Sequence, residues 1–128
     1  MIPEKIDRLL LRTQKPARYC GGEPGSVIKE KDQVDLRIAF CFPDLYEVGM
    51  SHLGMKILYG LLNSEEGTWC ERVFAPDVDF QQLMEENGVK LYGLESFDPL
   101  DQFDMVDFTL QYEMCYTTIL NMLRLGGV

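Results

Sequence analysis

The residue types that could do chemistry are concentrated in residues 42–54, which read FPDLYEVGMSHLG. This segment follows a short apolar run and precedes a helical pattern, which is the place where open α/β sheets bind ligands. Its two glycines and helix start could face an anion. It contains neither a phosphate-loop sequence nor G-x-G-x-x-G, so a standard nucleotide site is not expected. Its candidate ligand-binding residues are Asp44, Tyr46, Glu47, Gly49, Ser51, His52 and Gly54.

Polar residues also follow the other predicted strands. The further candidates are Arg72, Glu95, Gln111, Tyr112 and Glu113. The carboxylates of Glu47, Glu95 and Glu113 could converge, and one of them could then act as a general acid or base. The alternative that we favour is that they accept hydrogen bonds from loop amides or from Arg72, which is itself suited to a buried ion pair.

No complete catalytic set is visible. Ser51 and His52 are adjacent, and neighbouring residues on a helix do not face each other, so they do not form a nucleophile and base pair. No group of His, Cys, Asp and Glu has metal-ligand spacing. We therefore expect no catalytic residue and no metal ligand. A small self-contained hydrolase built on Glu47, Ser51 and His52 is the least favoured alternative.

The elements that must position these residues alternate between strand and helix patterns. Such alternation indicates βαβ units, a mostly parallel open sheet and helices on both faces. Residues 1–34 are expected to form a short helix and an extended arm rich in Pro and Gly, and residues 35–128 the α/β domain with about four strands. The predicted strands are residues 36–42, 71–75, 89–94 and 105–112, and the predicted helices are residues 3–12, 51–62, 79–86 and 116–123.

The charge is strongly acidic and unevenly distributed. The whole chain has a net charge of −9, and residues 35–128 carry five Lys and Arg against sixteen Asp and Glu. An acidic body repels a phosphate backbone, so nucleic acid is not an expected partner. The chain has no apolar run that could span a bilayer and no secretory signal at its start. We expect a soluble, cytoplasmic protein with reduced cysteines.

Several segments resemble the N-terminal region of a family of uncharacterised bacterial radical S-adenosylmethionine (SAM) proteins. The similarity runs from about residue 15 to residue 128, and residues 42–54 are its most specific part. The segments that carry it are KPARY at residues 15–19, FPDLYEVGMSHLG at residues 42–54, ERVFAP at residues 71–76 and LQYE at residues 110–113.

The resemblance implies a flavodoxin-like, cobalamin-binding-like domain in front of a radical SAM barrel. That barrel carries C-x-x-x-C-x-x-C, which holds a [4Fe-4S] cluster with an iron left open for SAM. This spacing does not occur here, so the cluster and SAM are expected only in a downstream domain beyond Val128. The chain stops where another strand should begin, and we expect it to continue into that barrel.

Cobalamin is the cofactor that the resemblance raises for the domain itself. Well-known cobalamin domains use D-x-H-x-x-G, in which the histidine ligates cobalt. Here Asp44 and Gly49 keep the spacing, but Tyr46 stands at the ligand position, and a protonated tyrosine is a poor ligand. Radical SAM relatives can bind cobalamin without that histidine.

Two interpretations of the function therefore stay open. The first is a non-catalytic domain that binds a small-molecule ligand or cofactor for a radical SAM Fe-S enzyme. The second is a degenerate cobalamin-like scaffold that binds no cofactor and packs against the barrel.

Overall fold

The centre of the molecule is an open sheet of three parallel strands. The computed structural model describes all of residues 1–128. Strand β1 (Leu36–Phe42) lies between β2 (Thr68–Phe74) and β3 (Met105–Phe108). The predicted α/β fold with an open parallel sheet is confirmed. The apolar run of β1 explains its central place, because a strand covered on both faces needs few polar side chains.

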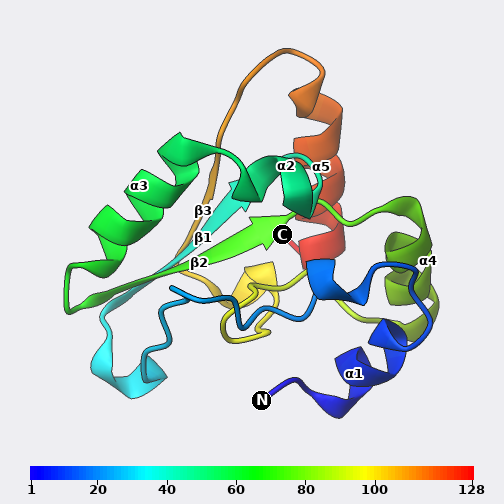
Figure 1. The fold of residues 1–128 in the computed structure, drawn as a ribbon, viewed down its shortest axis with the longest axis horizontal. Coiled ribbons are helices and arrows are strands. Elements are labelled where there is room, and N and C mark those ends of the chain that lie inside the picture. Colours follow the sequence, from blue (N-terminus) through cyan, green and yellow to red (C-terminus); the bar gives the residue numbers. More distant parts are fainter.

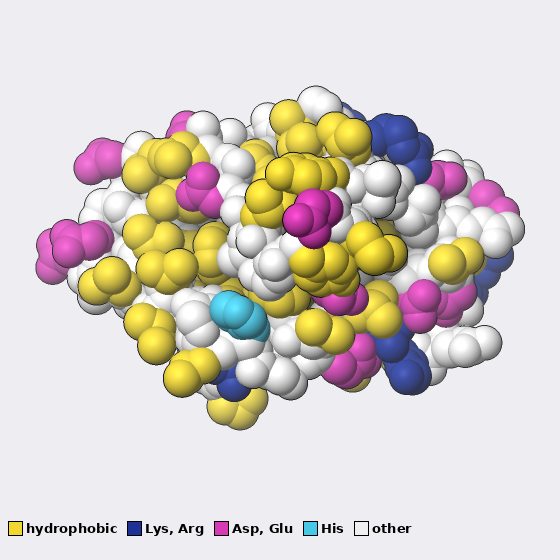
Figure 2. Space-filling model, turned by 90° about the horizontal axis from the view of Figure 1, so that it is seen from above, with side chains coloured by type: hydrophobic (Ala, Val, Ile, Leu, Met, Phe, Trp, Pro, Cys, Tyr) yellow, Lys and Arg dark blue, Asp and Glu magenta, His cyan; other side chains and the backbone are white.

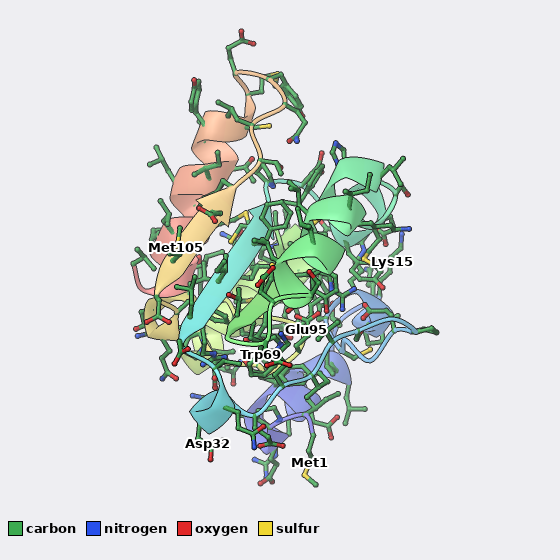
Figure 3. All side chains as sticks on the ribbon, turned by 90° about the vertical axis from the view of Figure 1, so that its left-hand side faces the viewer. Met1, Lys15, Asp32, Trp69, Glu95 and Met105 are labelled. Carbon is green, nitrogen blue, oxygen red and sulfur yellow. The ribbon has the colours of Figure 1, made fainter.

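Helices cover both faces of the sheet. Figures 1 and 3 show α3 on one side of the sheet and α5 on the other. Helix α4 lies close to α5, since the Arg124 guanidinium donates to Glu85 and the Asn121 amide donates to Gln81. The helices are α1 (Glu4–Leu10), α2 (Tyr46–Met50), α3 (Leu53–Asn63), α4 (Val78–Asn87) and α5 (Cys115–Gly126).

The main core fills the space between the sheet and its helices. The fully buried side chains include Trp69 and Val73 from β2, Phe80 and Met84 from α4, and Met122 from α5. The predicted helix 79–86 agrees with α4, which ends at Gly88 in the left-handed conformation at φ +61°. A glycine adopts that conformation without steric cost. No helix in the structure is both long and apolar enough to cross a membrane.

The prediction of a strand at residues 89–94 is wrong. The segment makes one isolated antiparallel bridge, between Tyr92 and Pro99. Its amides go to different partners: Leu91 N–H donates to α5, and Leu94 N–H donates to the carbonyl of Arg72. The segment is apolar because it is buried, but no single neighbouring strand offers it a ladder. The sheet therefore has three strands instead of about four.

The last predicted strand is shorter than expected, and one short helix was not predicted. The strand predicted to reach residue 112 ends at Phe108, since Thr109 N–H makes the last bond to β1, at 3.2 Å from the carbonyl of Cys41. Residues 42–54 contain the separate short helix α2, which periodicity did not reveal. Its five residues are too few to show a helical repeat.

The N-terminal arm, residues 13–33, lies against the domain along much of its length. Tyr19 stacks on Phe80 with ring centroids 3.9 Å apart. The backbone of Val27 accepts a bond from the Trp69 indole at 2.9 Å and donates one to the Tyr59 hydroxyl at 2.8 Å. The Lys29 ammonium donates to three carbonyls at the end of α3 and the start of β2. The division at residue 34 stays a prediction.

Candidate functional site

The strand order places a topological switch point at the carboxyl ends of β1 and β3. The chain leaves β1 toward β2 on one side, then crosses to β3 on the other side. In open α/β sheets, ligands bind where the direction of the connections reverses in this way. The order β2-β1-β3 is also that of the first three strands of a flavodoxin-like sheet. The loops after β1 and β3 border this switch point, and they contain most of the predicted site residues.

At the same edge of the sheet, Arg18 of the arm bridges the segments that follow β1 and β2. Its Nε lies 2.6 Å from Glu47 Oε1, and its Nη1 lies 2.8 Å from Asp77 Oδ2. The Arg18 side chain is 8% exposed. The hydrogen bonds from Arg18 lower the pKa of both carboxyl groups below their usual range. Glu47 is therefore an ionised ion-pair partner here, not a general acid.

A second arm residue, Glu23, joins Tyr46 to Arg72. The Tyr46 hydroxyl donates to Glu23 Oε1 at 2.6 Å, and Arg72 Nη2 donates to Glu23 Oε2 at 2.8 Å. Burial favours the neutral form of Glu23, but the two hydrogen bonds outweigh it and lower its pKa. Burial and the Glu23 carboxylate raise the pKa of Tyr46, which therefore remains a neutral phenol. Glu23 and Arg18 were not among the residues predicted from the sequence.

Arg72 is held on its other side by Glu95. The Arg72 Nε donates to Glu95 Oε1 at 2.6 Å, and the Arg72 backbone N–H donates to Glu95 Oε2 at 2.9 Å. The Tyr59 hydroxyl donates to the same carboxylate at 3.1 Å. Figure 3 shows Glu95 in the interior, and burial raises its pKa to about 7 even though Arg72 opposes the shift. The pairing with Arg72 is the one that we favoured from the sequence.

His52 begins α3 and provides its N-cap. Its Nδ1 accepts the N–H of Met55 at 3.1 Å, and its ring packs against Phe42 with centroids 5.2 Å apart. Ser51 does not cap this helix, because its hydroxyl donates to the carbonyl of Glu47 at 2.8 Å. That carbonyl lies one turn earlier in the chain, in α2, so the Ser51 hydroxyl bonds to α2 and not to the first turn of α3. Ser51 and His52 therefore do not form a nucleophile and base pair.

The two glycines of this segment have different surroundings. A Cβ on Gly49 would lie 2.1 Å from the Phe74 ring, so α2 approaches β2 only because this residue lacks a side chain. A Cβ on Gly54 would lie 2.9 Å from the His52 ring. Asp44 is structural in the same region: its carboxylate accepts the N–H of Leu45, and its carbonyl accepts the N–H of Ala75.

The predicted residues after β3 remain accessible. Gln111, Tyr112 and Glu113 are all exposed, and Gln111 Oε1 accepts a bond from the Thr109 hydroxyl at 3.2 Å. The carboxylates of Glu47, Glu95 and Glu113 therefore do not converge on one site. Glu47 pairs with Arg18, Glu95 pairs with Arg72, and Glu113 faces solvent.

Exposed apolar side chains surround the accessible part of the site. Figure 2 shows them on both sides of the one histidine, which is cyan, with acidic groups among them. We call this surface the apolar rim face. It consists of Val48, Leu53, Ile57 and Leu61 from α2 and α3, and Leu110, Tyr112 and Met114 from the loop after β3, each 48% to 77% exposed. Large clustered apolar patches of this kind mark binding surfaces more often than they mark ordinary exteriors.

The side chains that could hold a metal or a corrin are limited. No group of three or more His, Cys, Asp and Glu side chains is arranged to hold a metal ion. Tyr46 does not fit as a cobalt ligand, because its hydroxyl is a donor to Glu23 and its pKa is raised. The imidazole of His52 uses Nδ1 at the helix cap, and that leaves Nε2 as its remaining nitrogen for a ligand.

Comparison with known proteins gives one family match. A family model described as "Radical SAM proteins, N-terminal" matches residues 54–128, which are more than half of the chain. No curated protein and no solved structure matches the chain significantly.

Proposed function

Starting from the finding that the chain belongs to the family of radical SAM proteins, N-terminal region, we propose that it is a non-catalytic domain that holds a ligand or cofactor for a downstream radical SAM domain. By this proposal, the [4Fe-4S] cluster and SAM are bound by the downstream domain. This chain supplies one wall of the ligand site. A cytoplasmic location is part of the same proposal, because its four cysteines are free thiols of the kind that a reducing compartment preserves.

The apolar rim face is the observation that carries this proposal. It borders the β1–β3 switch point, where open α/β sheets bind their ligands. The polar residues His52, Gln111 and Glu113 lie in the same segments as these apolar side chains, and Gln111 and Glu113 are exposed. A few polar groups in an apolar surround are typical of small-molecule sites. We propose that the radical SAM domain covers this face and that the ligand lies between the two domains.

Cobalamin is one candidate for that ligand. The motif position of the cobalt ligand is Tyr46, which does not fit, so the proposal involves no bond from Tyr46 to cobalt. A corrin could lie on the apolar rim face, where its flat ring would be in contact with aliphatic side chains. Its chemistry in such a protein would be that of the cofactor itself.

A second candidate function is a scaffold that binds no cofactor. The arrangement of Arg18 and Tyr46 favours it, since both side chains are committed to partners within the chain. In this alternative the apolar rim face contacts the radical SAM domain directly, and no ligand lies between them.

The docking test uses charged substitutions on exposed residues. Leu53→Glu and Met114→Glu change side chains that are 70% and 77% exposed, so the fold should be retained. Leu11→Glu is the matched control, because Leu11 is 84% exposed but lies at the end of α1. Binding to the separately produced radical SAM domain, measured by calorimetry, should weaken about tenfold or more for the two rim variants and stay unchanged for the control. Equal binding by all of these proteins would contradict docking on this face.

The cofactor test separates the two candidate functions. Hydroxocobalamin is added to the protein containing both domains, and the visible spectrum is followed. A ligand-bound spectrum that is lost in Met114→Glu supports the ligand-binding function. A spectrum identical to that of free hydroxocobalamin favours the scaffold. His52→Asn tests the imidazole alone, since asparagine also caps helices well.

A further inference from the structure

We propose that the cavity between the arm, α2 and α3 is a second binding site, and that it takes a small neutral molecule with an apolar body and one hydrogen-bond acceptor. The cavity has a volume of about 350 Å³. The residues that determine its chemistry are Val27, Met50, Met55, Tyr59, Gly60 and Arg72. This site goes beyond the proposed function, because it lies under the arm and not on the apolar rim face.

Arg72 is the group that would orient the ligand. Its side chain is 8% exposed, and carboxylates accept from its Nε and Nη2. Its Nη1 has only the thioether of Met50 as acceptor, at 3.4 Å. Sulfur in a thioether is a weak acceptor, and a buried donor that lacks a strong one is costly. Arg72 and Met50 both line the cavity, so a ligand carbonyl there could receive this N–H.

The charges around Arg72 select a neutral ligand. The carboxylates of Glu23 and Glu95 both contact the guanidinium, so an anion would meet two like charges near its binding group. A cation would meet the guanidinium itself, and Lys56 also lines the cavity. A carbonyl or an amide avoids both costs and still offers an acceptor to Nη1.

The walls of the cavity select an apolar body. Met50 and Met55 have flexible, polarizable side chains that adapt to varied apolar shapes. The Tyr59 ring already stacks near the guanidinium, with the Arg72 Cζ atom 5.1 Å from the ring centroid. A Cβ on Gly60 would meet no heavy atom within 4 Å, so this side of the cavity is open. The volume lies at the small end of the usual range for ligand pockets.

Three compounds of similar shape test the chemistry directly. Benzamide is neutral and carries a carbonyl acceptor, benzoate is its anionic analogue, and benzylamine is a cation without an acceptor. Each is added to the protein labelled with ¹³C at the methionine methyl groups, two of which report on this cavity. We expect benzamide to shift the Met50 and Met55 signals and to bind about tenfold more tightly than the other two. No shift with benzamide, or equal binding of all three, would overturn the proposal.

Substitution of Gly60 tests the location. Gly60→Leu fills the cavity from a position with free space and should abolish the benzamide-induced shifts. Gly60→Ala is the matched control, because it also replaces glycine in α3 but leaves most of the volume, and it should retain binding. Unchanged binding by Gly60→Leu would place the compound elsewhere and overturn the proposal.

Substitution of Met50 tests the role of Arg72 without removing a buried charge. Arg72→Met would leave Glu23 and Glu95 without their partner, so it could fail to fold. Met50→Leu keeps the apolar volume and removes the only acceptor of Nη1, so benzamide should bind at least as tightly as to the wild-type protein. Loss of binding would show that Met50, not Arg72, recognises the probe. Rim variants such as Leu53→Glu should bind benzamide normally, which distinguishes this site from the proposed function.

Discussion

Glu95 completes the outer edge of β2 with its side chain. Its Oε2 accepts the backbone N–H of Arg72 at 2.9 Å, while the adjacent Leu94 N–H donates to the Arg72 carbonyl at 3.0 Å. A neighbouring strand would ordinarily satisfy both of these backbone groups. The same carboxylate also accepts from the Arg72 guanidinium, so one residue fixes both the backbone and the side chain of its partner.

This arrangement makes stability depend on pH between about 4.5 and 7. The pKa of Glu95 is raised from 4.5 to about 7 in the folded protein, because burial disfavours its charged form. As the pH rises through this window, the unfolded chain releases the proton first. The free energy of unfolding therefore falls, by up to ~3 kcal/mol from this group, and becomes constant above pH 7.

Glu95→Gln should remove most of this dependence. Urea unfolding at several pH values measures it, and Glu66→Gln, at an exposed position, is the control. Burial also raises the pKa of Glu71, so a weaker fall of the same sign should remain in the variant. An identical slope in the wild-type protein and Glu95→Gln would contradict the assignment.

Two glycine substitutions should change stability in opposite directions. Gly49→Ala places a methyl group 2.1 Å from the Phe74 ring and 3.2 Å from the Phe42 ring, so α2 must move. Overpacking of this kind costs about 1–3 kcal/mol. Gly60→Ala lies in the interior of α3 with free space around it, and it should stabilise the helix by about 0.5–1 kcal/mol. Urea unfolding measures both, and equal effects would contradict the packing described for α2.

The Glu23 contacts should hold the arm against the domain. Glu23→Gln weakens the bonds to Tyr46 and Arg72 and should lower the free energy of unfolding by about 2 kcal/mol, as expected for bonds to a charged group. Trypsin should then cleave the arm faster after Lys31. Glu30→Gln is the control, since Glu30 is on the same arm and exposed. Similar cleavage rates in the two variants would mean that Glu23 does not fasten the arm.

The sequence pattern predicted those strands and helices that are determined by nearby residues alone. The strand at residues 36–42 coincides with β1 because its apolar run is bounded by Asp35 and Pro43. The helix at residues 79–86 matches α4 within a residue because an Asp cap and a terminal Asn-Gly accompany its repeat. Residues 89–94 also have a largely apolar pattern, but whether such a run becomes a strand depends on partners distant in sequence. Its amides bond to β2 and α5 instead of to one strand.

The site was predicted only as far as its loops. The rule for open sheets identified residues 42–54 and the loop after β3, but it gave no means of finding Arg18 and Glu23. These two residues lie in a Pro- and Gly-rich arm, and their partners are 23 to 59 residues away in the sequence. One signal was available: the KPARY segment places an arginine in a chain of acidic net charge, where carboxylates could pair with it.

Arg18 should stabilise the arm through the two carboxylates that it bridges. Because Glu47 and Asp77 are 52% and 44% exposed, solvent screens each pair, and we expect a coupling of about 1 kcal/mol for each in double-mutant cycles. Arg18→Lys should lose most of this coupling, because a single ammonium cannot reproduce the fork that contacts both loops. The pair of Arg124 and Glu85 is the control, since the Arg124 side chain is 59% exposed against 8% for Arg18, and a smaller coupling is expected. Full retention of stability in Arg18→Lys, measured by urea unfolding, would show that net charge, not the geometry of the guanidinium, closes the edge between β1 and β2.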